Sequence, residues 1–169
     1  IFVMPSIIHN KSIEGFGILA VTLMKLRDFK EENFAKFHPG GSLGRRLLTT
    51  VGDVMKKKNL PIISSKATIK EVIQRISEGK LGLVVIIDNN KIIGIITDGD
   101  IRRTMESREK DFFNLKAEDL MSNHPKLIYE TDKLISASTI MSQHKINSLL
   151  VVNETNDLVG VVQVYDLGV

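Results

Sequence analysis

The hydrophobic and polar positions follow the same order twice in the C-terminal part of the chain. In each copy a short segment carrying Asp-x-Met comes first, and an extended segment beginning at Pro61 or Pro125 follows it. An amphipathic helix is predicted next, because apolar residues recur there at helical spacing. Two strands joined by a turn at residues 88–91 or 153–157 complete each copy, since Asn and Asp favour tight turns. The apolar positions of the predicted helices are Ile69, Val72, Ile73 and Ile76 in the first copy and Leu134, Ala137 and Met141 in the second.

The two copies align at a nearly constant offset. Residues 94–101 recur 66 positions later as residues 160–167, and residues 83–87 match residues 148–152 at an offset of 65. The apolar runs in the predicted strands are continuous, which is expected where helices cover one face of a sheet and a partner sheet covers the other. The pattern therefore predicts an α/β (α+β) fold made of tandem β-α-β-β-α repeats.

Residues 1–48 have a different pattern. An apolar strand is predicted at residues 1–5, and helical spacing of apolar residues follows Ser12. A strand and a helix are half of a βαβ unit, so we expect this region to be the end of a larger α/β domain and the chain to be a fragment. The predicted organisation is a domain remnant and linker at 1–48 and two repeats at 52–108 and 117–169.

Composition narrows the class of protein. Apolar residues make up 43% and charged residues 25% of the chain, which is typical of globular proteins. The net charge of +3 is too small to indicate nucleic-acid binding. The longest uncharged apolar stretch, residues 15–24, is too short to span a bilayer. We therefore expect a soluble, cytoplasmic protein without a membrane or nucleic-acid partner.

His38 is the strongest candidate for catalysis. It begins His-Pro-Gly-Gly, and three glycines and a proline within residues 39–44 impose a constrained turn. An imidazole held in such a turn suits general acid/base chemistry, because histidine titrates near neutral pH. The chain has no cysteine, and none of its four histidines has the spacing of a metal-binding pair, so we expect no metal site.

Residues 94–100 read Gly-Ile-Ile-Thr-Asp-Gly-Asp and fit the ligand motif Gly-h-x-Thr/Ser-x-x-Asp. With this motif, the tandem repeat resembles a CBS-domain pair, a module that senses adenosine nucleotides in many enzymes and transporters. The resemblance implies a nucleotide site that includes Thr97, Asp98, Asp100 and Asp166. A short carboxylate can accept hydrogen bonds from ribose hydroxyls, and a hydroxyl at a helix N-terminus can contact a phosphate.

The second copy departs from the motif. It keeps Asp166 but has Gln163 where a threonine is expected, so if one site binds, we expect it around Thr97 and Asp100. A structural interpretation stays open, in which Thr97 and Asp100 only cap the following helix. Arg102 and Arg103 could contact a phosphate, but paired arginines early in a surface helix are more often exposed to solvent.

Residues 29–47 read Phe-x(4)-Phe-Ala-x-x-His-Pro-Gly-Gly-x-Leu-Gly-Arg-x-Leu and lead directly into the repeats. This string is similar to the arabinose 5-phosphate isomerases, which join a sugar-isomerase (SIS) domain to tandem CBS domains. The resemblance implies interconversion of D-ribulose 5-phosphate and D-arabinose 5-phosphate, toward the Kdo sugar of lipopolysaccharide or capsule. It gives His38 a role in acid/base chemistry or ring opening.

By this resemblance the substrate is a sugar phosphate, and catalysis requires no cofactor. The CBS pair would take a regulatory ligand, either an adenine nucleotide or CMP-Kdo, and a homo-oligomer, dimer or tetramer, is expected. The family's other catalytic groups belong upstream, so we expect this chain alone to be inactive. Two alternatives remain: a non-enzymatic CBS-pair nucleotide sensor that regulates a partner protein, and a scaffold that only holds a tetramer together.

Overall fold

The computed structural model describes residues 22–23, 25–26 and 42–168. The chain divides into two units, Ile1–Leu48 and Thr49–Val169. The first unit includes helix α3 (Ser42–Leu48). The predicted strand at 1–5, the predicted helical positions 13–20 and the His-Pro-Gly-Gly segment lie outside the described residues.

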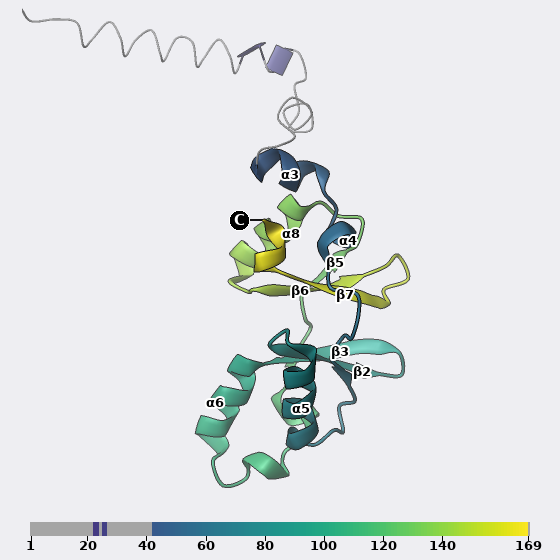
Figure 1. Ribbon diagram of the computed structural model, residues 1–169. Coiled ribbons are helices and arrows are strands. Elements are labelled where there is room, and N and C mark those ends of the chain that lie inside the picture. Colours follow the sequence, from purple (N-terminus) through teal and green to yellow (C-terminus); the bar gives the residue numbers. More distant parts are fainter. Residues whose placement is uncertain (1–21, 24, 27–41, 169) are drawn as a thin grey trace, which may run out of the picture. The chain divides into compact units, whose positions relative to one another are not determined.

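The second unit contains two sheets, each built around the paired central strands of one repeat (Figure 1). In each sheet a short first strand is parallel to the second strand, which pairs with an antiparallel neighbour. The first sheet has the order β1 (Ile62–Ile63), β2 (Leu83–Asp88), β3 (Lys91–Thr97) and β4 (Ser122–Asn123). The second has the order β5 (Leu127–Tyr129), β6 (Ser148–Val152) and β7 (Leu158–Gln163).

Helices follow the strands as the repeat predicts. The helical segments are α4 (Val51–Val54), α5 (Ile69–Gly79), α6 (Asp98–Arg108), η1 (Phe112–Asn114), α7 (Ala117–Leu120), α8 (Leu134–His144) and η2 (Val164–Leu167). The two predicted amphipathic helices are confirmed as α5 and α8. Ile73 of α5 is nevertheless exposed, because it lies at the edge of the apolar stripe centred on Ile69, Val72 and Ile76. Within the described part of the chain, no helix is long and apolar enough to cross a lipid bilayer.

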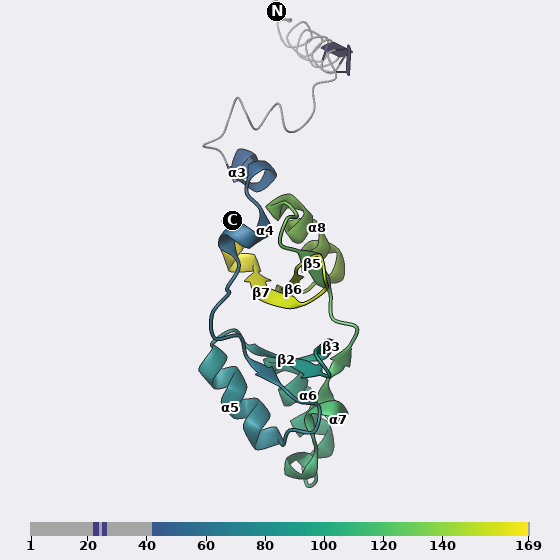
Figure 2. The ribbon, with the colours of Figure 1, turned by 90° about the vertical axis from the view of Figure 1, so that its right-hand side faces the viewer.

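Strands β2 and β6 are buried on both faces. Along β2, Val84 and Ile86 pack against α5 and its neighbours. Leu83 and Val85 point the other way, into a cluster with residues of the second sheet such as Leu150. The two sheets face each other and the helices lie on their outer faces (Figure 2). This arrangement confirms the explanation of the continuous apolar runs.

The short helix at the start of each repeat packs into the core of the other repeat. Val51 of α4 is fully buried in the cluster built around α8, and its N–H donates to the Asp132 carbonyl oxygen at 2.8 Å. Ala117 of α7 is fully buried in the cluster built around α5, and its N–H donates to the Ala67 carbonyl oxygen at 2.9 Å. The two repeats therefore exchange their first helices.

The segments that follow these helices are exchanged in the same way. Lys56, after α4, forms an antiparallel bridge with Val161 of β7, and Ser122, after α7, pairs with Ile95 of β3. Each repeat therefore completes the sheet or the core of its counterpart.

Candidate functional site

A cavity of about 730 Å³ is lined by residues from both repeats of the second unit. Its lining comes from segments 81–83, 97–100, 122–126 and 145–148 and from Ile95, Arg103, Gln163 and Tyr165. Residues 97–100 lie where β3 ends and α6 begins, and residues 122–126 lead from α7 to β5. The exchange of segments between repeats therefore brings residues 122–126 to the end of β3.

Thr97 and Asp100 are joined by hydrogen bonds across the first turn of α6. The Thr97 N–H donates to Asp100 Oδ2 at 2.8 Å, and Thr97 Oγ1 donates to the same oxygen at 2.6 Å. The Asp100 N–H in turn donates to Thr97 Oγ1 at 3.3 Å. This is a capping box, which satisfies free N–H groups at the start of a helix. The capping role considered from the sequence is present, and it leaves both side chains in the cavity wall.

Asp98 lies beside them at the first position of α6. Its N–H donates to the Gly82 carbonyl oxygen at 3.1 Å, and its side chain is exposed. Gly82 has a φ of +65° and also lines the cavity. The N-terminus of α6 is thus held against the start of β2, with three polar side chains at one edge of the cavity.

Cationic side chains are the second feature of the cavity wall. Arg103, Lys126 and Lys145 line it, together with His124. The Arg103 guanidinium donates to Asp100 Oδ1 at 2.7 Å, although its side chain remains 67% exposed. A wall that carries hydroxyl and carboxylate groups beside several cations has the chemistry to bind a polar ligand with a negative charge.

The second repeat contributes Gln163 and Tyr165 to this cavity, whereas Asp166 is not among the lining residues. Asp166 Oδ2 accepts a hydrogen bond from the Gln163 N–H at 2.9 Å, which repeats the arrangement of Thr97 and Asp100. Its other carboxylate oxygen lies 3.8 Å from Lys56 Nζ.

The structure thus brings together Thr97, Asp98 and Asp100 in one cavity wall that does not include Asp166, while His38 lies outside the described residues. Of the two arginines, Arg103 lines the cavity and Arg102 does not. Sequence reasoning did not identify segments 122–126 and 145–148 as part of the site. No motif marks these segments, because they reach the cavity only through the exchange of segments between the repeats. Their equivalent positions in the two repeats are the one feature of the sequence that could have indicated them.

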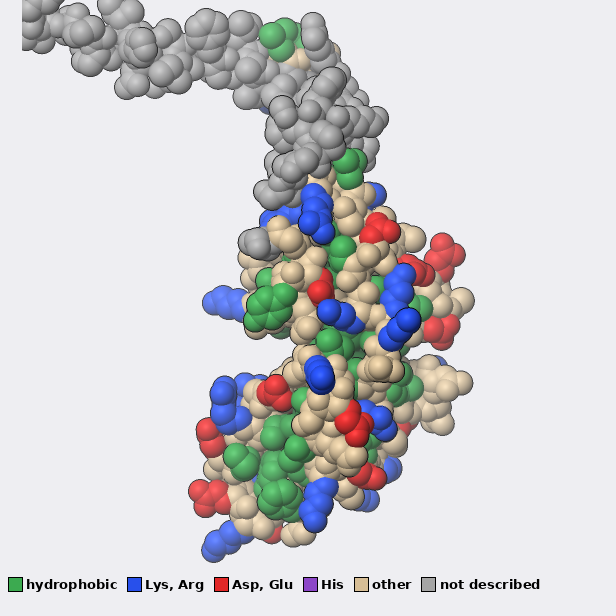
Figure 3. All heavy atoms as spheres, viewed as in Figure 1, with side chains coloured by type: hydrophobic (Ala, Val, Ile, Leu, Met, Phe, Trp, Pro, Cys, Tyr) green, Lys and Arg blue, Asp and Glu red, His purple; other side chains and the backbone are tan. Residues whose placement is uncertain are grey.

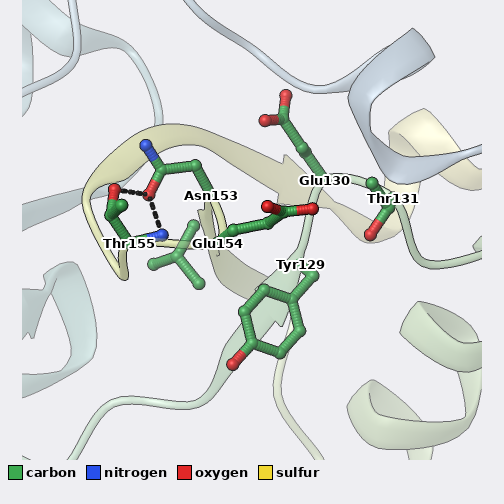
Figure 4. A pocket seen from close by; sticks show the side chains of 7 residues that line it. Tyr129, Glu130, Thr131, Asn153, Glu154 and Thr155 are labelled. Carbon is green, nitrogen blue, oxygen red and sulfur yellow. Dashed lines mark hydrogen bonds between the residues drawn. The ribbon is translucent and has the colours of Figure 1, made fainter.

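A smaller cavity of about 320 Å³ lies in the second repeat, between the end of β5 and the turn that joins β6 to β7 (Figure 4). Asn153 Oδ1 accepts hydrogen bonds from the Thr155 N–H at 3.0 Å and from Thr155 Oγ1 at 2.8 Å. Glu130 and Glu154 give this cavity two carboxylates. Among the described residues, no group of three or more His, Cys, Asp or Glu side chains is placed to hold a metal ion.

Comparisons with known proteins agree with this architecture. The CBS domain family model matches residues 51–107 and 117–167, which together are more than half of the chain. Among solved structures, CBS domain protein PAE2072 from Pyrobaculum aerophilum, complexed with AMP, aligns with a TM-score of 0.64 and 25% identity over 71% of this chain and 91% of that chain. The CBS domain pair of protein MJ0100, in complex with 5′-methylthioadenosine and S-adenosyl-L-methionine, gives a TM-score of 0.62 and 25% identity over 70% and 92% of the two chains.

Sequence relatives extend the likeness beyond the CBS domains. A probable arabinose 5-phosphate isomerase of Haemophilus influenzae is 43% identical over 145 residues, which are 86% of this chain and 43% of that protein. Arabinose 5-phosphate isomerase KpsF of Escherichia coli is 42% identical over 149 residues, or 88% of this chain and 45% of that protein. The chain therefore spans less than half the length of these curated relatives. With two matched segments that fold as paired repeats, the chain belongs to the CBS domain family.

Proposed function

We propose that this chain is the C-terminal regulatory and oligomerisation part of an aldose–ketose isomerase that interconverts D-ribulose 5-phosphate and D-arabinose 5-phosphate. The observation that carries the proposal is the 43% identity to a probable arabinose 5-phosphate isomerase over 86% of the chain. The match leaves only about a seventh of the chain unaligned, and His38 lies further than that from either end of the chain. The aligned region must therefore include the segment around His38 as well as the CBS domains. A free-standing nucleotide sensor would not require likeness in that segment.

His38 is the group of this chain that we assign to the reaction. An aldose–ketose isomerisation moves a proton between C1 and C2 and needs a group that can accept and return it. The Pro-Gly-Gly sequence after His38 favours a constrained turn, and histidine is the side chain type best suited to proton transfer near neutral pH. Its role is general acid/base catalysis or ring opening of the sugar phosphate, without a cofactor. The product would supply Kdo synthesis for lipopolysaccharide or capsule, in the cytoplasm.

The test is the activity of the intact isomerase that contains this chain. His38→Ala should lower turnover at least about 100-fold, because general acid/base groups contribute about 10²–10⁴-fold. The matched control is His144→Ala at the C-terminal end of α8, where the imidazole is exposed and activity should be unchanged. A loss below about threefold for His38→Ala would remove His38 from the mechanism. The chain by itself should show no isomerisation, since the remaining catalytic groups belong upstream.

The CBS pair is proposed to bind a regulatory nucleotide in the 730 Å³ cavity, either an adenine nucleotide or CMP-Kdo. Thr97, Asp98 and Asp100 stand at one edge of that cavity, and Arg103 and Lys126 are cations that suit a phosphate. Two CBS proteins of similar fold were solved with AMP or with S-adenosyl-L-methionine and 5′-methylthioadenosine, which supports this ligand class.

Self-association is proposed for the same unit. Helix α6 has no buried residue, and hydrophobic side chains gather on the surface of the first repeat between α5 and α6 (Figure 3). The exposed apolar side chains on these elements and the adjoining η1 are Ile73, Met105 and Phe113. An apolar surface of this kind is typical of a protein–protein interface and supports a homo-oligomer.

A further inference from the structure

Gln163 connects the two repeats at the wall of the 730 Å³ cavity. Its side-chain Nε2 donates to the Leu81 carbonyl oxygen of the first repeat at 3.0 Å and to Ser148 Oγ of the second repeat at 3.1 Å. Gln163, Leu81 and Ser148 all line the cavity. The amide of one residue therefore fixes the distance between two wall segments that come from different repeats.

Thr97, the residue equivalent to Gln163 in the first repeat, makes its side-chain hydrogen bonds within its own repeat. Its short side chain stays within its own turn, where it bonds to Asp100. Gln163 has the same backbone bond to its own aspartate, Asp166, but its side chain is long enough to leave the turn. The two repeats are therefore not equivalent at this position, because Gln163 stands where the first repeat has a hydroxyl residue. The contacts of Gln163 lie in the wall of the cavity that Thr97 also lines.

The surroundings of the two aspartates are unequal as well. Asp100 lines the cavity, and so do Ser122 and His124. The residues 66 positions before these two are Lys56 and Lys58, which belong to a run of three lysines. Asp166 accordingly has the Lys56 ammonium group 3.8 Å from its carboxylate and is absent from the cavity wall. A nucleoside would find the hydroxyl and carboxylate pair on the Thr97 side only.

We propose that the CBS pair binds one nucleotide per chain, at the Thr97–Asp100 edge, and that Gln163 is the positioning residue that ties the cavity wall together from the opposite repeat. This inference rests on the nucleotide binding in the proposed function and adds its stoichiometry and the residue that shapes the site.

The test is isothermal titration of the chain with AMP and, separately, with CMP-Kdo, alongside thermal unfolding without ligand. We expect one site per chain. Asp100→Asn should weaken binding at least about tenfold, since it removes a charged acceptor, whereas Asp166→Asn should change affinity less than about threefold. The aspartates hold equivalent positions in the repeat, so each variant controls for the other.

Gln163→Met keeps the length of the side chain and removes the amide. It should weaken binding about tenfold without changing the stoichiometry, and lower Tm of the free chain by about 3–6 °C through the loss of two hydrogen bonds. Gln143→Met, at an exposed position of α8, is the matched control and should leave both quantities unchanged. A residue that only stabilised the fold would lower Tm and leave the dissociation constant alone.

Four results would overturn the inference. They are two sites per chain, an Asp166→Asn loss as large as that of Asp100→Asn, an unchanged dissociation constant for Gln163→Met, and an unchanged Tm for that variant. Wild-type chain that binds neither nucleotide would instead refute the nucleotide part of the proposed function, and the single-site assignment with it. The Tm of Gln163→Met would then still decide whether the amide links the repeats.

Discussion

At the scale of single residues, two glycines allow the exchanged segments to approach the sheets closely. A Cβ added at Gly160 of β7 would lie 2.5 Å from Met55 Sδ and 3.0 Å from the Lys56 carbonyl oxygen. A Cβ added at Gly94 of β3 would lie 2.8 Å from Met121 Sδ. Both glycines face the segment that comes from the other repeat. Their lack of a side chain is therefore a requirement of the exchange.

Gly160→Ala should lower the free energy of unfolding by about 1–3 kcal/mol, because the Lys56 backbone cannot move aside as a flexible side chain would. Urea denaturation measures the change. Gly99→Ala in the first turn of α6 is the control, since its added Cβ would meet the flexible end of Arg103 at 3.2 Å and Thr97 Oγ1 at an ordinary contact distance of 3.5 Å. That variant should be neutral or stabilising, as alanine is a better helix former than glycine. Equal losses of unfolding free energy for the two variants would contradict the explanation that Gly160 is needed for the close approach of Met55 and Lys56.

At the scale of elements, helices α4 and α5 begin with a capping box closed by a carboxylate. The Thr68 N–H donates to Glu71 Oε2 at 2.7 Å, and this bond, followed by the one from Thr68 Oγ1, holds the pKa of Glu71 below its ordinary value. The bond from Thr50 Oγ1 to Asp53, with that from the Thr50 N–H, lowers the pKa of Asp53 in the same way. These helix starts depend on ionised acids.

The unfolding free energy should therefore fall in acid. A carboxyl whose pKa is lower in the folded state contributes stability above its unfolded pKa, about 4 for Asp and Glu, and this contribution is lost as the pH falls through the folded pKa. Glu71→Gln removes one titrating group, so its denaturation midpoint should depend less steeply on pH below about pH 4.5 than that of the wild type. Identical slopes for the two proteins would show that the Thr68 bonds do not stabilise the ionised form.

At the scale of the whole second unit, the exchange of α4 and α7 makes each core depend on both repeats. Val51 and Met55 pack against Leu134 and Val162, which lie about 80 residues or more further along the chain. Ala117 and Leu120 pack against Ile69 of the first repeat. Neither core is complete without a helix from the other repeat, so the two repeats should unfold together.

Val51→Ala tests this coupling. It removes two buried methyl groups and should lower the free energy of unfolding by about 2 kcal/mol. Hydrogen exchange should accelerate to the same extent in β2 of the first repeat and in β6 of the second. Gln143→Ala at an exposed position of α8 should leave both rates nearly unchanged. Faster exchange confined to β6 would show that the repeats unfold independently.

The sequence predicted the features that depend on local pattern. Helical spacing located α5 and α8, and the two asparagines of the first turn, Asn89 and Asn90, have positive φ angles of 50° and 60°, as expected for a tight turn. The motif at residues 94–100 led to three side chains that line the cavity. The exchange of α4 could not be predicted, because a helix of four residues is too short to specify which of two similar cores it will join. The reach of Gln163 to Leu81 depends on that same tertiary approach.

The exchanged position of α4 also sets an order of events during protein synthesis. Val51 is made about 80 residues before Asp132, whose carbonyl accepts its N–H. At a ribosomal rate of about 5–20 residues per second, α4 waits roughly 4–16 s for its binding site to be translated. The first repeat waits in the same way for α7. The nascent chain must therefore keep apolar segments exposed until the second repeat emerges. During this interval the chain is most prone to aggregate and a chaperone would bind it best.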